Sequence, residues 1–131
     1  MHRYEYSVDG TTWKTFSEMY EIESDLKQLL LGDMNIFLVN SIPPVDGVFT
    51  IQADGVKTWR GIFKKRDIKT LHGIEVLIGD VDDAGNVLNT EKIYRLDCAD
   101  FDEVYQIFEN YILHQKLPAY EQWEDMSDIR L

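Results

Sequence analysis

Cysteine is nearly absent from this chain of 131 residues, in which Cys98 is the only one. A single thiol cannot form an internal disulfide, and it favours a reducing compartment. Long apolar runs are also absent. The longest uninterrupted one is Ile36–Val39, far below the about 20 residues of a membrane-spanning helix, and residues 1–6 lack the apolar segment of a signal peptide. We therefore expect a cytoplasmic protein that has no membrane partner.

Sequence signatures of catalysis are missing too. The chain has no glycine-rich phosphate loop and no serine in a nucleophile elbow. Its three histidines lack the spacing of metal ligands; they are His2, His72 and His114. Cys98 precedes a predicted helix start, but the carboxylates of Asp97 and Asp100 oppose a thiolate there. The sequence therefore predicts no catalytic residues, no metal site and no cofactor.

Positive charge is scarce. The chain has 13 Lys and Arg against 24 Asp and Glu, which gives a net charge of −11. The apolar fraction of 44% is ordinary for a globular protein, and the length is that of one domain. Excess carboxylates disfavour binding to nucleic acid or anionic lipid and favour a basic protein partner. The alternative is that they only keep the protein soluble.

The charges are unevenly distributed along the chain. Residues 97–131 contain nine acidic and two basic side chains, whereas residues 57–69 contain six basic side chains and one acidic one. The basic run holds Lys64-Lys65-Arg66 near Trp59 and Phe63, a combination that also occurs in nucleic-acid-binding proteins. Because the whole chain is acidic, we interpret this run as a basic strand edge, which discourages pairing between sheets.

Alternating apolar residues and short apolar runs predict seven strands. These cover Tyr4–Val8, Thr11–Phe16, Met34–Val39, Val48–Ala53, Val56–Phe63, Ile74–Ile78 and Val87–Leu96. Asp9-Gly10 and Asp54-Gly55 are typical two-residue hairpin turns between neighbouring strands. Ile42-Pro43-Pro44 predicts a stiff extended connection that interrupts the third strand.

Helical spacing of apolar residues predicts two amphipathic helices, one over residues 17–31 and one over residues 100–117. Thr15 or Ser17 can cap the start of the first helix, Thr15 with Glu18 forming a capping box, and Gly32 can cap its end. Asp100 with Glu103 caps the second helix, and Pro118 ends it. Hairpin connections outnumber crossover helices. We therefore expect one α+β domain over residues 1–131, with a mainly antiparallel curved sheet of about six to seven strands and both helices on one face. Strand order and oligomeric state stay open.

One hairpin resembles a known motif. The segment Tyr6-Ser7-Val8-Asp9-Gly10-Thr11-Thr12-Trp13 is similar to a hairpin of discoidin-type coagulation factor domains. The resemblance covers only this hairpin, and the two predicted helices do not belong to that all-β sandwich. We interpret it as shared turn chemistry.

The loop after the sixth predicted strand partly matches a calcium-binding loop. Asp80, Asp82, Gly85 and Glu91 fall at its positions 1, 3, 6 and 12. Position 5 is Ala84, however, and the flanking residues are strand-like instead of helical. We therefore interpret the loop as a hairpin in which Asp, Gly and Asn provide turn geometry.

The C-terminal tail, residues 118–131, combines aromatic and acidic side chains. Tyr120, Trp123 and Met126 recur every three residues among four acids, a spacing that fits a short amphipathic helix. Aromatic anchors ringed by carboxylates suit docking on a basic protein surface. The alternative is that the aromatic rings fold back on the core and the acids form a solvated face.

The whole chain, as a small acidic α+β protein without catalytic motifs, resembles the immunity proteins of bacterial polymorphic and contact-dependent toxin systems. That resemblance rests on size and character, and it implies a role without transferring residues. It implies a bacterial inhibitor that occludes a cognate basic toxin domain. The expected contact residues are Asp80, Asp82, Asp83, Glu121, Trp123, Glu124, Asp125 and Asp128.

Two other functions stay open. A ligand-binding or regulatory module could hold a small molecule in an aromatic-lined pocket between the sheet and the helices. An enzyme is the third hypothesis, and it would need an acid–base pair that only the folded chain assembles.

Overall fold

The alternation of apolar and polar residues along the strands produces a sheet with one apolar face, and two helices cover that face. The computed structural model describes residues 3–30, 36–59 and 69–130. Along the chain its elements are β1 (Arg3–Ser7), β2 (Lys14–Phe16), α1 (Tyr20–Leu30), β3 (Ile36–Val45), β4 (Val48–Trp59), β5 (Lys69–Val81), β6 (Val87–Ala99), α2 (Phe101–His114), the 3-10 helix η2 (Tyr120–Gln122), β7 (Glu124–Asp125) and α3 (Ser127–Arg130).

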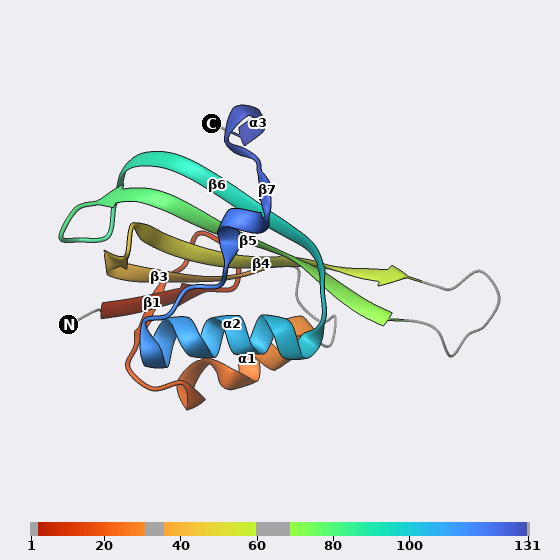
Figure 1. Ribbon diagram of the computed structural model, residues 1–131. Helices are drawn as coiled ribbons and strands as arrows, with labels where there is room; N and C mark the ends of the chain where they lie inside the picture. The colour runs from red at the N-terminus through yellow and green to blue at the C-terminus, as the bar shows by residue number, and fades with distance from the viewer. Residues whose placement is uncertain (1–2, 31–35, 60–68, 131) are drawn as a thin grey trace.

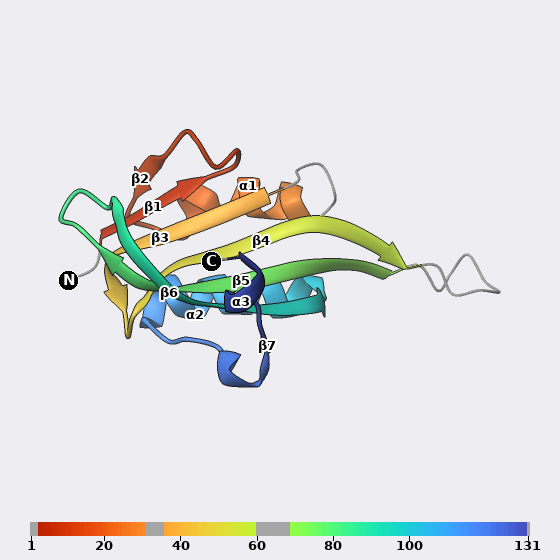
Figure 2. The same cartoon turned by 90° about the horizontal axis from the view of Figure 1, so that it is seen from above.

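Within the described residues, seven strands form one antiparallel sheet in the order β2-β1-β3-β4-β5-β6-β7. Helices α1 and α2 lie under the same face of this curved sheet, as Figure 1 and Figure 2 show. The α+β class, the antiparallel curved sheet and the placement of both helices are thus confirmed.

Aromatic rings fill the core between the sheet and the helices. Phe37 of β3 and Phe108 of α2 meet edge to face, with ring centroids 5.3 Å apart. Tyr4 of β1 and Tyr111 of α2 meet in the same way at 5.9 Å. Leu26 of α1 is fully buried in the same cluster. Such pairs add about 0.5–1.5 kcal/mol each beyond the burial of their area.

Two tyrosine hydroxyls fix α2 against the sheet. The buried Tyr111 hydroxyl donates a hydrogen bond to the carbonyl of Val48 in β4 at 3.0 Å. The Tyr4 hydroxyl donates to the carbonyl of Tyr111 at 3.0 Å, and it accepts from the side-chain amide of Gln115 at 3.2 Å. Burial raises the pKa of the Tyr111 hydroxyl, so it stays a protonated donor at neutral pH. The C-terminal end of α2 is therefore held at one place over β1 and β4.

The second predicted hairpin is wrong. Strand β4 runs without a break through Asp54 and Gly55, where the sheet has only a register shift. The turn lies instead at Asp46-Gly47, with φ of 45° and 88°, between the paired residues Val45 and Val48. Positive φ at both central residues is the requirement of a type I′ hairpin turn. Residues 60–63 of the predicted strand Val56–Phe63 lie outside the described residues.

The predicted interruption at Pro43 and Pro44 is also wrong. Strand β3 continues through both prolines to Val45. Its pairing with β1 ends at Ile42, and its register with β4 shifts between Asn40 and Val45. The prolines thus occupy an irregular stretch of the ladder, where their missing N–H groups cost no regular hydrogen bond.

The first hairpin forms, but its loop is longer than two residues. Strand β2 covers only the last part of the predicted strand Thr11–Phe16. The Asp9 carboxylate accepts hydrogen bonds from the backbone N–H groups of Thr11 and Thr12 at 2.8 Å and 2.7 Å, and these bonds lower the pKa of Asp9. Only Gly10 of the predicted turn pair has a positive φ. The aspartate therefore organises the loop through its side chain.

The N-terminal cap matches the sequence at α2 but not at α1, and α2 ends at His114, with Gln115 at a φ of 50° as its C-terminal cap, before the predicted end at Pro118. Asp100 caps α2 by accepting from the backbone N–H of Glu103, as predicted. At α1 the backbone N–H groups of Ser17 and Glu18 both donate to the side chain of Glu21, at 2.7 Å and 2.8 Å, so Glu21 takes the place expected for Glu18. The proposed C-terminal cap at Gly32 lies outside the described residues.

Removal of the hydrogen bond from the Tyr111 hydroxyl should lower the stability of the protein. Tyr111→Phe should lower the free energy of unfolding by about 1–2 kcal/mol, because it removes a hydrogen bond from a fully buried place. Tyr20→Phe is the matched control, since Tyr20 is 73% exposed, and it should change stability by less than about 0.5 kcal/mol. Urea denaturation of both variants measures the difference. Equal stability of both variants and the parent chain would contradict this role of Tyr111.

Candidate functional site

The loop with Asp80, Asp82 and Asp83 is a hairpin turn between β5 and β6, as interpreted from sequence. The carboxylate of Asp82 accepts from the backbone N–H groups of Ala84 and Asn86 at 2.9 Å and 2.8 Å, and its pKa is lowered mainly by the bonds from Asn86. Asp82 therefore has a structural role inside the turn. Asp80 is exposed and pairs with Asn89 across the ladder.

This loop folds back toward the first strand. The guanidinium of Arg3 donates to the backbone carbonyl of Asp83 at 2.9 Å. A Cβ atom on Gly85 would lie 2.6 Å from the Cδ1 atom of Ile42, which shows how closely the loop meets β3. Register shifts between β5 and β6 accompany this bend.

The acidic tail is docked along its described length. The Tyr120 ring packs on Tyr94 of β6, with centroids 5.2 Å apart, and Trp123 is partly buried against the core. Glu124 and Asp125 form β7, which pairs with β6 at the edge of the sheet. The tail forms a 3-10 turn, a short strand and a single helical turn, so the expected single amphipathic helix is wrong.

Side chains and backbone both hold the tail. Asp125 forms an ion pair with Lys92 at 3.3 Å, and hydrogen bonds from Ser127 are the main cause of the lowered pKa of Asp125. The N–H of Met126 donates to the carbonyl of Ile93 at 2.8 Å, and the N–H of Ile93 donates to the Ser127 hydroxyl at 3.0 Å. Figure 2 shows the tail wrapping around the β6 edge of the sheet.

The eight expected contact residues fall into two groups. Asp80 pairs with Asn89, whereas Glu124 of the tail pairs with Arg95 farther along β6. Asn89 and Arg95 are six positions apart, which corresponds to roughly 20 Å along a strand. The structure therefore brings together the tail acids and Trp123, and it keeps the loop acids apart from them.

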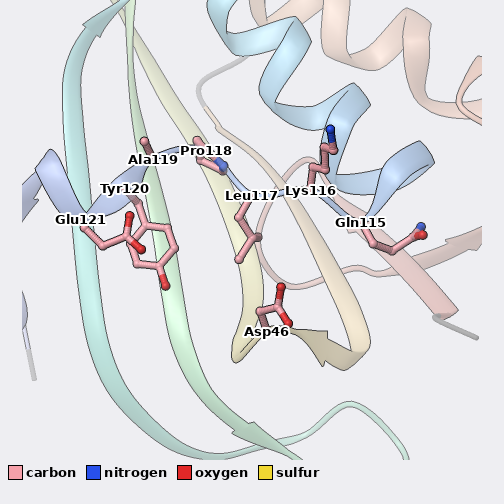
Figure 3. Close-up of a pocket in the computed structure, with 8 residues that line it drawn as sticks. All are labelled: Asp46, Gln115, Lys116, Leu117, Pro118, Ala119, Tyr120 and Glu121. Atoms are coloured by element: carbon pink, nitrogen blue, oxygen red, sulfur yellow. The ribbon is translucent and has the colours of Figure 1, made fainter.

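A depression of about 480 Å³ lies beside the tail, and we call it the tail pocket (Figure 3). Its wall is formed by Asp46 of the β3–β4 turn and by residues 115–121, which run from the C-terminal end of α2 into the tail. Leu117 points toward Asp46, and Glu121 lies beside the ring of Tyr120, whereas Lys116 points away (Figure 3). The pocket thus combines two carboxylates with one aromatic and several apolar groups.

The tail pocket has two acidic residues, Asp46 and Glu121, and one basic residue, Lys116, in its lining. Burial raises the pKa of the Tyr120 hydroxyl, and the carboxylates of Glu121 and Asp46 contribute to this rise. Neither carboxylate forms an ion pair with another residue in the described part of the chain. The C-terminal end of α2, where the helix dipole is negative, opens into the same place. The lining thus combines an excess of acidic side chains with apolar surface.

Sequence reasoning missed Asp46 as a site residue. A signal was available, because Asp46-Gly47 lies between two valines and is as typical a hairpin turn as Asp54-Gly55. The approach of this turn to residues 115–121 follows from the packing of α2 on the sheet, and local sequence patterns do not contain it.

A charged cluster crosses the sheet face opposite to the helices. The guanidinium of Arg95 on β6 binds the carboxylate of Asp54 on β4 at 2.6 Å and 2.9 Å, and it also bonds to Glu75 on β5 and to Asp97. The ion pair with Asp54 is the main cause of the raised pKa of Arg95. A Cβ atom on Gly73 would collide with the guanidinium, so the glycine makes room for it. The cluster ties three strands together.

A second depression, of about 150 Å³, lies near Tyr6, the β1–β2 loop and Asp25 of α1. The Tyr6 hydroxyl donates to the Asp25 carboxylate at 3.1 Å. Small-molecule sites usually exceed about 300 Å³. The size of this depression therefore gives little support to a small-molecule site at this place.

The charged cluster predicts a compensating pair of substitutions. Arg95→Met should cost about 3 kcal/mol of stability, because it removes the Arg95 charge from Glu75, which is 2% exposed. Adding Glu75→Met should recover at least about half of that loss, since apolar residues replace both charges. Asp97→Asn is the exposed control and should change stability by less than about 1 kcal/mol. Chemical denaturation tests this, and a double variant no more stable than Arg95→Met would contradict it.

No helix of the described residues is long and apolar enough to cross a membrane. Comparison of the chain with protein-family models, with curated proteins and with solved structures found no match.

Proposed function

We propose that this chain is a protein-binding inhibitor, an immunity-type protein of the cytoplasm that neutralises a basic toxin domain by steric and electrostatic occlusion. One observation carries the proposal. In a chain of net charge −11, a docked tail presents exposed carboxylates beside a pocket with two acidic residues in its lining. The lone thiol fits a reducing compartment.

The docked tail supports recognition by a preformed surface. Glu121, Glu124 and Asp128 are exposed on a segment that is anchored by its backbone and by Trp123. A surface that is already ordered loses less conformational entropy when a partner binds. The same carboxylates in a free tail would have to be ordered during binding.

The charge excess supports rapid encounter with a basic partner. Long-range attraction between an acidic inhibitor and a basic domain raises the association rate and orients the approach. Occlusion then requires only that the bulk of the inhibitor covers the active surface of the toxin. No chemical step by this chain is needed, which agrees with the lack of a catalytic signature in its sequence.

Capture from a lysate of the organism that encodes the chain tests this proposal. We expect one stoichiometric basic protein, identified by mass spectrometry, that is retained at low salt and released at high salt. With that partner purified, raising the ionic strength from 0.05 to 0.5 M should weaken the affinity by at least about tenfold.

Charge variants distinguish the contribution of the tail carboxylates to binding from that of the overall negative charge of the chain. Glu124→Gln combined with Asp128→Asn should slow association more than the exposed controls Glu18→Gln and Asp102→Asn, which remove the same charge elsewhere. Absence of any stoichiometric partner, or an affinity that salt does not change, would contradict the inhibitor proposal. The small-molecule alternative would then be tested by a thermal-shift screen.

A further inference from the structure

We propose that the tail pocket receives an arginine side chain of the partner. This inference rests on the proposed function and specifies the contact through which a basic domain would be held. The occupant follows from the lining of the pocket, in which Asp46 and Glu121 supply negative charge and Tyr120 and Leu117 supply aromatic and apolar surface.

The two carboxylates come from opposite walls of the pocket. Asp46 lies on the β3–β4 turn, and Glu121 lies on η2, beside Tyr120 (Figure 3). Neither is neutralised by an ion pair in the part of the chain that the structure describes. Both act on the hydroxyl of Tyr120, whose pKa is raised first by burial and further by their charge. A cation near the Tyr120 hydroxyl would therefore be attracted by both carboxylates.

A guanidinium suits this lining better than an ammonium ion. The guanidinium is planar, offers five donors in a rigid fork, and stacks on aromatic rings. It can bind a carboxylate with two parallel hydrogen bonds and still contact Tyr120 through its face. Its three methylene groups have apolar neighbours available in Leu117 and Pro118. Lysine offers a more strongly hydrated point charge and lacks the planar face.

The walls of the pocket are fixed before binding. The Tyr111 hydroxyl joins α2 to Val48, which directly follows the Asp46-Gly47 turn. At the other wall, the Gln115 side chain donates to the carbonyl of Ile112 and to the Tyr4 hydroxyl, at 2.9 Å and 3.2 Å. Walls that are already ordered favour a rigid, planar side chain over a flexible cation, because less conformational entropy is lost on binding.

Titration of the full chain with hexa-arginine and hexa-lysine peptides tests the proposal. Asp46→Asn and Glu121→Gln remove the two charges. Asparagine tolerates the positive φ of 45° at position 46, so the turn should persist. The control double variant, Glu18→Gln with Asp102→Asn, removes two exposed acids that are not part of the pocket lining. Calorimetry gives the affinities, and NMR shifts of Leu117 and Tyr120 report where the peptide binds.

We expect hexa-arginine to bind at least about threefold more tightly than hexa-lysine. The pocket double variant should weaken hexa-arginine binding about tenfold, and the control double variant less than about twofold. Equal weakening by both double variants, or equal affinity for both peptides, would show general charge attraction. Either result would overturn the proposal that the tail pocket binds arginine.

Binding measurements with the captured partner distinguish failure of the proposed arginine site from failure of the proposed function. A partner that binds the pocket double variant as tightly as the parent chain overturns the proposed arginine site and is consistent with the inhibitor proposal. If hexa-arginine binds selectively in the tail pocket but capture yields no protein partner, the arginine site is supported and the inhibitor role is contradicted.

Discussion

The hydrogen bond from the Tyr111 hydroxyl to the Val48 carbonyl is the contact on which the pocket geometry depends. It joins the last turns of α2 to the strand that leaves the β3–β4 turn. Tyr4 joins the same helix to β1 through the Tyr111 carbonyl and through Gln115. Because the tail begins where α2 ends, the position of the tail follows from this anchoring. Both walls of the pocket thus share one buried support.

Charge has two different roles in this molecule. On the sheet face opposite to the helices, the guanidinium of Arg95 is surrounded by carboxylates of three strands, and its charge is used within the fold. In the tail pocket, Asp46 and Glu121 have no such cation among the described residues. Only the second kind of carboxylate keeps its charge available for another molecule. The large acidic excess of the sequence does not distinguish these two kinds.

The fold class could be predicted from sequence because it depends on local periodicity. The alternation of apolar residues, the two amphipathic helices and the cap at Asp100 are all read within a few positions of the chain. Local sequence does not identify the second hairpin turn, since Asp46-Gly47 and Asp54-Gly55 carry the same turn signal. The difference between them lies in tertiary contacts, because the Asp54 side chain bonds to Arg95 on a distant strand.

The candidate site was only partly predictable for the same reason. Tail residues such as Glu121 and Trp123 stand out by composition, and the structure places them on one docked segment. Asp46 is distant in sequence, and only the packing of α2 on the sheet brings it to the pocket. Asp82 shows the opposite error, since an aspartate in an acidic loop is used by the turn itself. Burial and hydrogen bonding, which sequence does not display, decide between these roles.

The origin of the pocket walls also sets when binding becomes possible. Residue 46 and residues 115–121 are separated by about half of the chain. During synthesis at about 5–20 residues per second, the turn emerges several seconds before the other wall exists. A nascent or prematurely ended chain can display acidic side chains, but it has no pocket. Recognition through the pocket would thus be limited to molecules that have completed α2 and docked the following segment.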